Sequence, residues 1–119
     1  MKMKNNLLLR LKEKEVRALK ELKEELLKRF SDAEIILYGS KARGDDKEFS
    51  DIDVLVLLDR EINNSLEEEI FSTAFQIELK YDVIFGIIVY SKKFWNSKLG
   101  NAMPIHWNID KEGMPINEV

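Results

Sequence analysis

The chain has 119 residues, 45% of them hydrophobic and 34% charged, so it can form one domain around a single modest core. Its formal net charge of −3 gives no overall basic field, and nucleic acid is therefore not indicated as a partner; the absence of cysteine excludes disulfides, a thiol nucleophile and a cysteine-based zinc site. The single histidine, His106, cannot form a multi-histidine centre, so any metal would be held by carboxylates, which favours Mg²⁺ or Mn²⁺.

The N-terminal segment, residues 7–30, carries leucines, Val16 and Phe30 at helical spacing among lysines and glutamates. This pattern predicts one or two amphipathic helices. The apolar run at residues 7–9 is too short for a secretory signal or a membrane span. We therefore expect a cytoplasmic protein with no membrane partner.

Two short strands and a helix follow. Residues 33–39, "AEIILYG", read as a buried strand that stops at Gly39, and "DIDVLVLLD" reads as a second strand buried on both faces. Ser65 and Glu68 have the spacing of a capping box, which predicts a helix from Leu66 to near Lys80. The next β-rich run, "DVIFGIIVY", predicts a third strand.

The tail, residues 91–119, predicts two short helices, with Ser91 as a cap, Gly113 as a stop, and Trp95 and Trp107 as packing anchors. The order of elements predicts a small α/β (α+β) fold, in which helices cover a mixed sheet of three to four strands. We expect one domain over residues 1–119, made of an N-terminal helical segment (7–30), a catalytic core (34–90) and a C-terminal helical tail (91–119).

Two acids open the second strand. Asp51 and Asp53 are two residues apart, so both side chains point to the same face of the sheet. One interpretation is that Asp51 caps the strand and Asp53 is a solvated edge residue. The strand around them is apolar, however, and two adjacent carboxylates there repel each other unless a cation or a shared proton relieves them. This favours a divalent ion bound by both.

A glycine-containing turn follows the first strand. Gly39 allows close approach of a phosphate to the backbone, and the Ser40 hydroxyl can add a donor. Lys41 and Arg43 supply positive charge nearby. Taken alone, the turn is better explained as a plain strand-to-helix connection with Ser40 as the N-cap. Residues 45–48 are predicted to form a solvated loop, and we assign them no catalytic or binding role.

The turn and the acids together form the pattern G-S-x10-D-x-D. It resembles the DNA polymerase β-like nucleotidyltransferase superfamily, and specifically its minimal nucleotidyltransferase branch. The stretch "GSKARGDDKEFSDIDVLVLL" closely matches the sequence motif of that branch, G-S-x-A-R-G followed by S-D-I-D-[VL]. The segment "NIDKEGMPI" is similar to the N-I-x-x-E-G segment that closes such domains. The resemblance extends over residues 37–116.

The resemblance implies a role for each matching residue. Gly39 and Ser40 would hold the β- and γ-phosphates of a nucleoside triphosphate, with Arg43 as a secondary contact. Asp51 and Asp53 would bind Mg²⁺ or Mn²⁺. A hydroxyl would attack the α-phosphate, so that a nucleotidyl group is transferred and pyrophosphate released.

Active members of the branch carry a third carboxylate on the next strand, which binds metal or takes the proton of the attacking hydroxyl. Here Ile84 and Gly86 occupy the positions where that acid is expected, and Asp82 stands at the start of the run. We take Asp82 as the third catalytic carboxylate; the alternative is that it is only a turn residue.

Several assignments follow from the resemblance alone. The substrate would be ATP, and AMP would go to a hydroxyl of a protein or small molecule. The partner would be a small helical HEPN protein, with this chain as the antitoxin of a toxin–antitoxin pair, or a second copy in a homo-oligomer. The alternative function is a catalytically weak or inactive nucleotide-binding subunit of a two-component complex.

Overall fold

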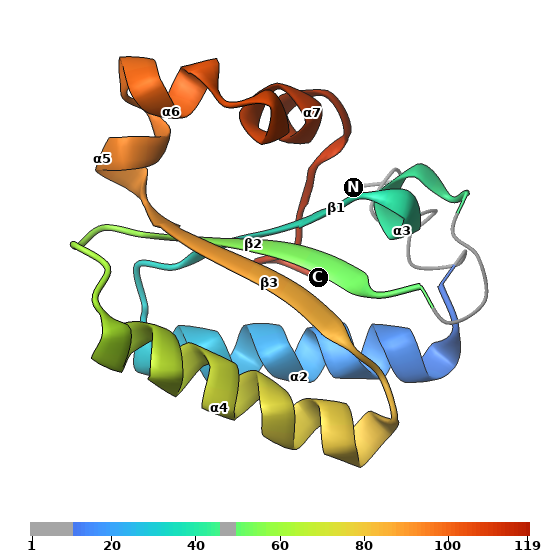
Figure 1. Ribbon diagram of the computed structural model, residues 1–119. Coiled ribbons are helices and arrows are strands. Elements are labelled where there is room, and N and C mark those ends of the chain that lie inside the picture. The colour runs from blue at the N-terminus through green and yellow to red at the C-terminus, as the bar shows by residue number, and fades with distance from the viewer. Residues whose placement is uncertain (1–10, 46–49) are drawn as a thin grey trace.

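Helices and strands alternate from α2 to β3 in the computed structural model, which describes residues 11–45 and 50–119, and three short helices then precede the last strand (Figure 1). In order, the elements are α2 (Glu13–Arg29), β1 (Glu34–Tyr38), α3 (Ser40–Arg43), β2 (Ile52–Leu58), α4 (Asn64–Tyr81), β3 (Phe85–Ser91), α5 (Lys92–Trp95), α6 (Lys98–Ala102), α7 (Pro104–Glu112) and β4 (Met114–Pro115).

The four strands form one mixed sheet in the order β3-β2-β1-β4. Strand β1 runs antiparallel to β2 and β4, whereas β2 and β3 are parallel and are joined by α4. In this register Asp53 lies between Tyr38 of β1 and Gly86 of β3. The predicted mixed sheet covered by helices is confirmed, and Asp53 of β2 lies between two neighbouring strands, with Asp51 directly before β2.

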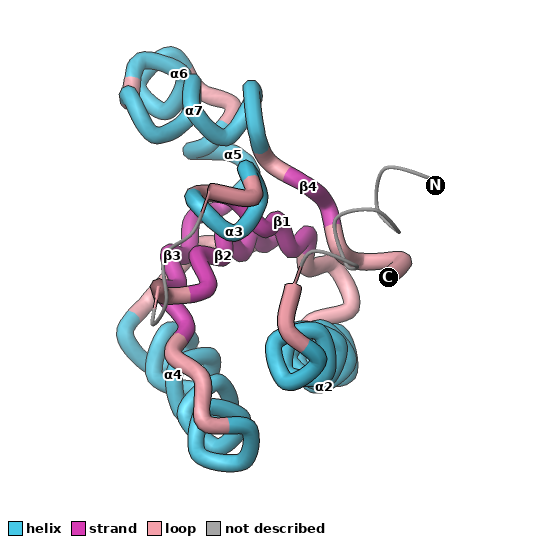
Figure 2. Tube along the Cα trace, turned by 90° about the vertical axis from the view of Figure 1, so that its right-hand side faces the viewer, coloured by secondary structure: helices cyan, strands magenta, loops and turns pink. Residues whose placement is uncertain are grey.

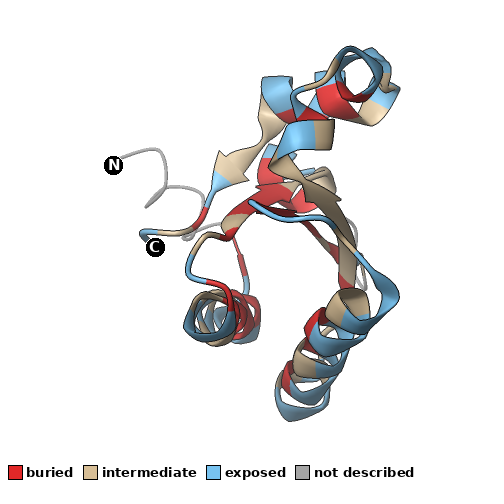
Figure 3. Ribbon diagram, turned by 90° about the vertical axis from the view of Figure 1, so that its left-hand side faces the viewer, coloured by how far each residue is buried: buried red, intermediate tan, exposed pale blue. Residues whose placement is uncertain are grey.

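Helices cover both faces of the sheet. Helices α2 and α4 lie on one face, and α5, α6 and α7 lie on the other (Figure 2). Strand β2 is buried from both sides: Ile52, Val54 and Val56 join the core beneath α2 and α4, whereas Leu55 and Leu57 pack with Trp95 and Ile109 of the C-terminal helices. Figure 3 shows buried residues concentrated in the sheet and on the sides of α2 and α4 that face it. The prediction of a doubly buried second strand is correct.

Three local predictions need correction. Helix α4 begins at Asn64 and is capped by Asn63, whose side chain accepts the Leu66 N–H at 2.8 Å; Ser65 does not cap it. The tail contains three short helices and the strand β4, because Met114 and Pro115 pair with β1. Trp107 is 63% exposed and lies beneath the Lys111 ammonium, 4.6 Å from the ring centroid.

The other tail predictions agree with the structure. Ser91 accepts the Phe94 N–H and caps α5, Gly113 ends α7, and Trp95 is buried. Over the described ranges, no helix is long and apolar enough to cross a membrane.

Candidate active site

The turn after β1 depends on glycine. Gly39 has φ +78° and ψ −158°, a backbone conformation that residues other than glycine rarely adopt. It forms the N-cap of α3. Ser40 is the first residue of α3, so it does not serve as the cap. The predicted strand–turn–helical-turn connection is therefore present, and it lies beside the start of β2, because Tyr38 pairs with Asp53.

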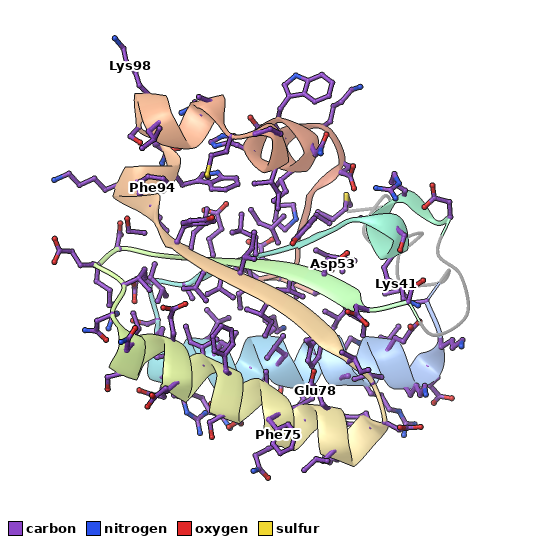
Figure 4. All side chains as sticks on the ribbon, viewed as in Figure 1. Lys41, Asp53, Phe75, Glu78, Phe94 and Lys98 are labelled. Carbon is purple, nitrogen blue, oxygen red and sulfur yellow. The ribbon has the colours of Figure 1, made fainter. Side chains whose placement is uncertain are left out.

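Glycine also makes room for the Asp53 carboxylate on both sides. A Cβ atom at Gly86 would lie 2.7 Å from Asp53 Oδ1, and a Cβ atom at Gly39 would clash with Asp53 Oδ2. The same Cβ atom at Gly86 would lie 4.0 Å from the Asp51 Cβ. The two acids thus share the face of the sheet on which Gly39 and Gly86 lack side chains, and Figure 4 shows Asp53 on the α7 side of β2.

The Asp53 carboxylate lies in an unfavourable electrostatic environment. Partial burial raises the pKa of Asp53, the negative charges of Asp51 and Glu112 raise it further, and Arg43 opposes the shift. Burial and the charge of Asp53 also raise the pKa of Tyr38 to about 12, so this hydroxyl stays protonated at neutral pH. A cation beside Asp51 and Asp53 would relieve the repulsion between them.

Glu112 is a site residue that the sequence reasoning missed. Its Oε2 atom accepts the Gly39 N–H at 2.8 Å and the Arg43 guanidinium at 2.9 Å. Glu112 is the last residue of α7, so this carboxylate ties the C-terminal helices to the turn that carries Ser40. The signal was available in the glutamate of the N-I-x-x-E-G segment, which the sequence analysis noted without assigning it a role.

Lys41 and Arg43 lie in different environments, although both belong to the same motif. Arg43 is exposed and contacts Asp45 and Glu112. Lys41 is buried and forms an ion pair with Glu15 of α2, with 2.5 Å between Nζ and Oε2 (Figure 4). Arg43 is therefore placed to contribute charge to the site, whereas Lys41 joins α3 to the helical layer on the other face.

The structure does not bring Asp82 to the other two acids. Asp82 is the left-handed C-cap of α4, with φ +55°, and its side chain is fully exposed, 3.7 Å from Lys14 of α2. Gly86 is the residue that faces Asp53 across the parallel strands. Within residues 11–45 and 50–119, no three acidic or histidine side chains gather in a metal-binding arrangement. The third-carboxylate assignment of Asp82 is thus unsupported by this geometry.

Comparison with known proteins gives concordant results. A family model described as a nucleotidyltransferase domain matches residues 19–105, which is more than half of the chain. Two similar proteins come from Methanocaldococcus jannaschii. "Putative protein adenylyltransferase MJ0141" is 41% identical over 58 residues, which cover 49% of this chain and 59% of that protein. "Putative protein adenylyltransferase MJ0604" is 37% identical over 79 residues, which cover 66% of this chain and 72% of that protein.

The chain spans less than two thirds of the first of these relatives and more than two thirds of the second. The matched region contains β1, the Gly39 turn, Asp51 and Asp53, whereas Glu112 lies beyond it. The chain belongs to the nucleotidyltransferase domain family.

Proposed function

We propose that the chain transfers AMP from ATP to a hydroxyl of a protein or small-molecule acceptor, in a reaction that depends on Mg²⁺ or Mn²⁺. One observation carries the proposal: Asp51 and Asp53 share one face at the start of β2, where Gly39 and Gly86 leave space around the Asp53 carboxylate. Both relatives are named as protein adenylyltransferases, which supports adenylyl transfer over transfer of another nucleotide.

The residues fit a hard divalent cation. Asp51 and Asp53 supply oxygen ligands, and the raised pKa of Asp53 reflects like charge and desolvation that a cation would offset. Two carboxylates do not complete an octahedral shell, so triphosphate oxygens and water would supply the remaining ligands. When bound, the cation would neutralise negative charge on the triphosphate.

The Gly39 turn would receive the phosphates. Ser40 can donate its hydroxyl and Arg43 its guanidinium, because both residues follow Gly39 on α3. The acceptor hydroxyl would lose its proton to solvent and form a bond to the α-phosphorus as the bond to the bridging oxygen breaks and pyrophosphate leaves. Glu112 would act as a positioning residue, because it holds the Gly39 N–H and the Arg43 side chain.

A second candidate function is an inactive nucleotide-binding subunit. The observation that favours it is Gly86, which stands opposite Asp53 where the family resemblance places a third carboxylate. In either case we propose that the acceptor site or an activating surface comes from another protein. A helical HEPN partner in a toxin–antitoxin pair is the partner that the family resemblance suggests.

The two functions are separated by incubating the chain with α-labelled ATP and Mg²⁺, with and without a co-purified partner. Nucleotidyl transfer predicts label on the acceptor and release of pyrophosphate, both abolished by Asp51→Asn/Asp53→Asn and by chelation of the metal. The matched control is Asp59→Asn, which removes an exposed carboxylate just beyond the other end of β2 and should retain activity. Label transfer that survives the double substitution would exclude the metal-pair assignment. Binding of ATP without transfer under every condition would identify an inactive subunit.

A further inference from the structure

Strand β3 forms an open edge of the sheet. It pairs with β2 on one side and is the terminal strand of the order β3-β2-β1-β4. The Ile52 N–H donates to the Ile84 carbonyl, so in the parallel register the even-numbered residues of β3 point their backbone groups toward β2. The backbone groups of Ile87 and Val89 therefore point outward, where the described residues supply no further strand.

This edge lacks the features that keep edge strands from pairing. The strand reads "FGIIVYS" and contains no charged residue and no proline. Natural edge strands are usually protected by lysine, proline, bulges or a covering element. At the start of β3, the Phe85 N–H donates a hydrogen bond to the Glu78 carboxylate of α4, at 2.7 Å. Beyond that point residues 86–91 of the strand present an uncharged edge.

Apolar side chains of α4 continue this surface. Phe71, Phe75 and Leu79 are 44%, 53% and 66% exposed and are spaced by four residues, so they follow one side of the helix. Phe71 and Phe75 line a hollow of about 480 Å³ together with Phe85 and Ile87. A second hollow of about 390 Å³ continues along the other half of the strand. Figure 4 shows Phe75 and Glu78 on α4, below β3.

We infer that this edge is the interface between two copies of the chain, whose β3 strands pair antiparallel about a two-fold axis at Ile88. Ile87 of each copy would then form a hydrogen-bonded pair with Val89 of the other, using the outward backbone groups. The two sheets would become continuous, and the exposed phenylalanines of the two α4 helices would lie beside each other under the junction.

The ends of the strand have complementary charge, which favours a second copy as the occupant. The side chain of Asp82, before β3, is fully exposed, although it lies 3.7 Å from Lys14 of α2, and Lys93, just after β3, is exposed. Antiparallel pairing about Ile88 brings the acidic end of each strand toward the basic end of the other. A two-fold axis also places the apolar stripe of α4 opposite itself, as a self-complementary interface requires. A purely helical partner would leave the outward groups of Ile87 and Val89 without a strand.

The inference concerns the fold and holds whether or not the proposed transfer reaction occurs. The measurement is molar mass by light scattering, combined with crosslinking of single-cysteine variants, since the chain contains no cysteine of its own. The expected mass is twice the 14.0 kDa of the chain. Ile88→Cys should form an intermolecular disulfide under mild oxidation, because the two residues would face each other as a non-hydrogen-bonded pair with Cα atoms about 4.5 Å apart.

The control is Leu99→Cys, at a residue that is 69% exposed on α6, away from the proposed interface. Phe75→Glu should weaken the dimer at least about tenfold, whereas Leu99→Glu should leave it unchanged. Circular dichroism melts of each variant establish that it is folded. A monomer at all concentrations with no crosslink at position 88 would overturn the inference. A dimer that crosslinks at position 99 instead, or that tolerates Phe75→Glu, would place the interface elsewhere and overturn it as well.

Discussion

The two faces of strand β2 serve different purposes. On the face toward α2 and α4, Ile52, Val54, Val56 and Leu58 are at most 1% exposed and pack in one apolar core. On the opposite face, Asp51 directly precedes the strand and Asp53 is the first strand residue on that side, and only from Leu55 onward does this face become apolar. One face stabilises the fold, whereas the start of the other holds two like charges that the fold does not need.

This difference explains how a small domain tolerates the acids. Four large side chains are buried on one face of β2, and Leu55 and Leu57 are buried on the other. This apolar burial stabilises the strand despite the unfavourable electrostatic environment of the Asp53 carboxylate. A local conflict between charge and burial that the rest of the structure overrides is typical of a functional site. The comparison predicts that substitutions on the two faces change stability in opposite directions.

The largest effect is expected on the core face. Leu58→Ala removes a fully buried side chain beneath α2 and α4 and should lower the free energy of unfolding by about 2 to 5 kcal/mol. Urea denaturation measures this change. Nucleotide binding by the folded fraction should be preserved, because Leu58 lies at the opposite end of β2 from the acids. A decrease of less than about 1 kcal/mol in the free energy of unfolding would contradict the proposal that this face of β2 stabilises the fold.

Gly39→Ala should have the next largest effect. The substitution places a Cβ atom against Asp53 Oδ2 and forces a side chain into a conformation that costs about 1 to 3 kcal/mol. We expect a matching loss of stability and at least about a hundredfold loss of transfer activity, since the carboxylate must move. Gly44→Ala is the control for backbone strain, because Gly44 also has a positive φ of 80°. Equal activity loss in both variants would argue against a specific contact with Asp53.

Glu112→Ala tests the tie between the C-terminal helices and the turn. Loss of the two hydrogen bonds to Gly39 and Arg43 should cost about 1 to 2 kcal/mol. The pKa of Asp53 should fall, because a nearby negative charge is removed. Glu112→Gln keeps an acceptor for the Gly39 N–H and should retain more of the stability. If the pKa of Asp53 is the same in all three proteins, Glu112 is only a packing residue.

Asp53→Asn should have the smallest effect on stability, and in the opposite direction. The pKa of Asp53 is raised in the folded chain, so the neutral carboxyl group favours folding and its ionisation opposes folding. The stability that the neutral form contributes is complete below the unfolded pKa, about 3.9, and is lost as the pH rises through the folded pKa. The variant should therefore melt a little above the wild type at pH 7. The gain should vanish at acidic pH, where the wild-type side chain is neutral.

Added Mg²⁺ should raise the melting temperature of the wild type and leave that of Asp53→Asn unchanged. Asp59→Asn, an exposed carboxylate beyond the end of β2, serves as the control and should keep the Mg²⁺ response. A wild type that is more stable than Asp53→Asn at neutral pH in the absence of metal would contradict the electrostatic account.

Much of this architecture could be predicted because it depends on local patterns. The apolar run of β2, the amphipathic spacing of α2 and the glycine at the end of β1 each express a rule that acts over a few residues. The pair Asp51 and Asp53 could be predicted because residues two apart on a strand share a face. These features do not depend on which strands become neighbours.

The remaining features depend on contacts between distant residues. Glu112 reaches Gly39 across 73 positions, and no local pattern gives that proximity. Gly86 acquires its importance only from its register opposite Asp53, and Asp82 loses its expected role because it ends α4 beside Lys14. The predicted capping residue of α4 was wrong for a simpler reason. Asn63, Asn64 and Ser65 are all residue types that favour the N-cap position, and the sequence does not distinguish among them.

The most direct test of the central claim is a carbon-13 NMR titration of the Asp51 and Asp53 carboxyl groups with and without Mg²⁺. The account predicts that the pKa of Asp53 lies above the ordinary value of aspartate in the free protein and that Mg²⁺ lowers its apparent pKa. The resonances of both carboxyl groups should shift with the same metal dependence. An Asp53 carboxyl that titrates at the ordinary value and does not respond to Mg²⁺ would contradict the claim that the two acids form a cation site.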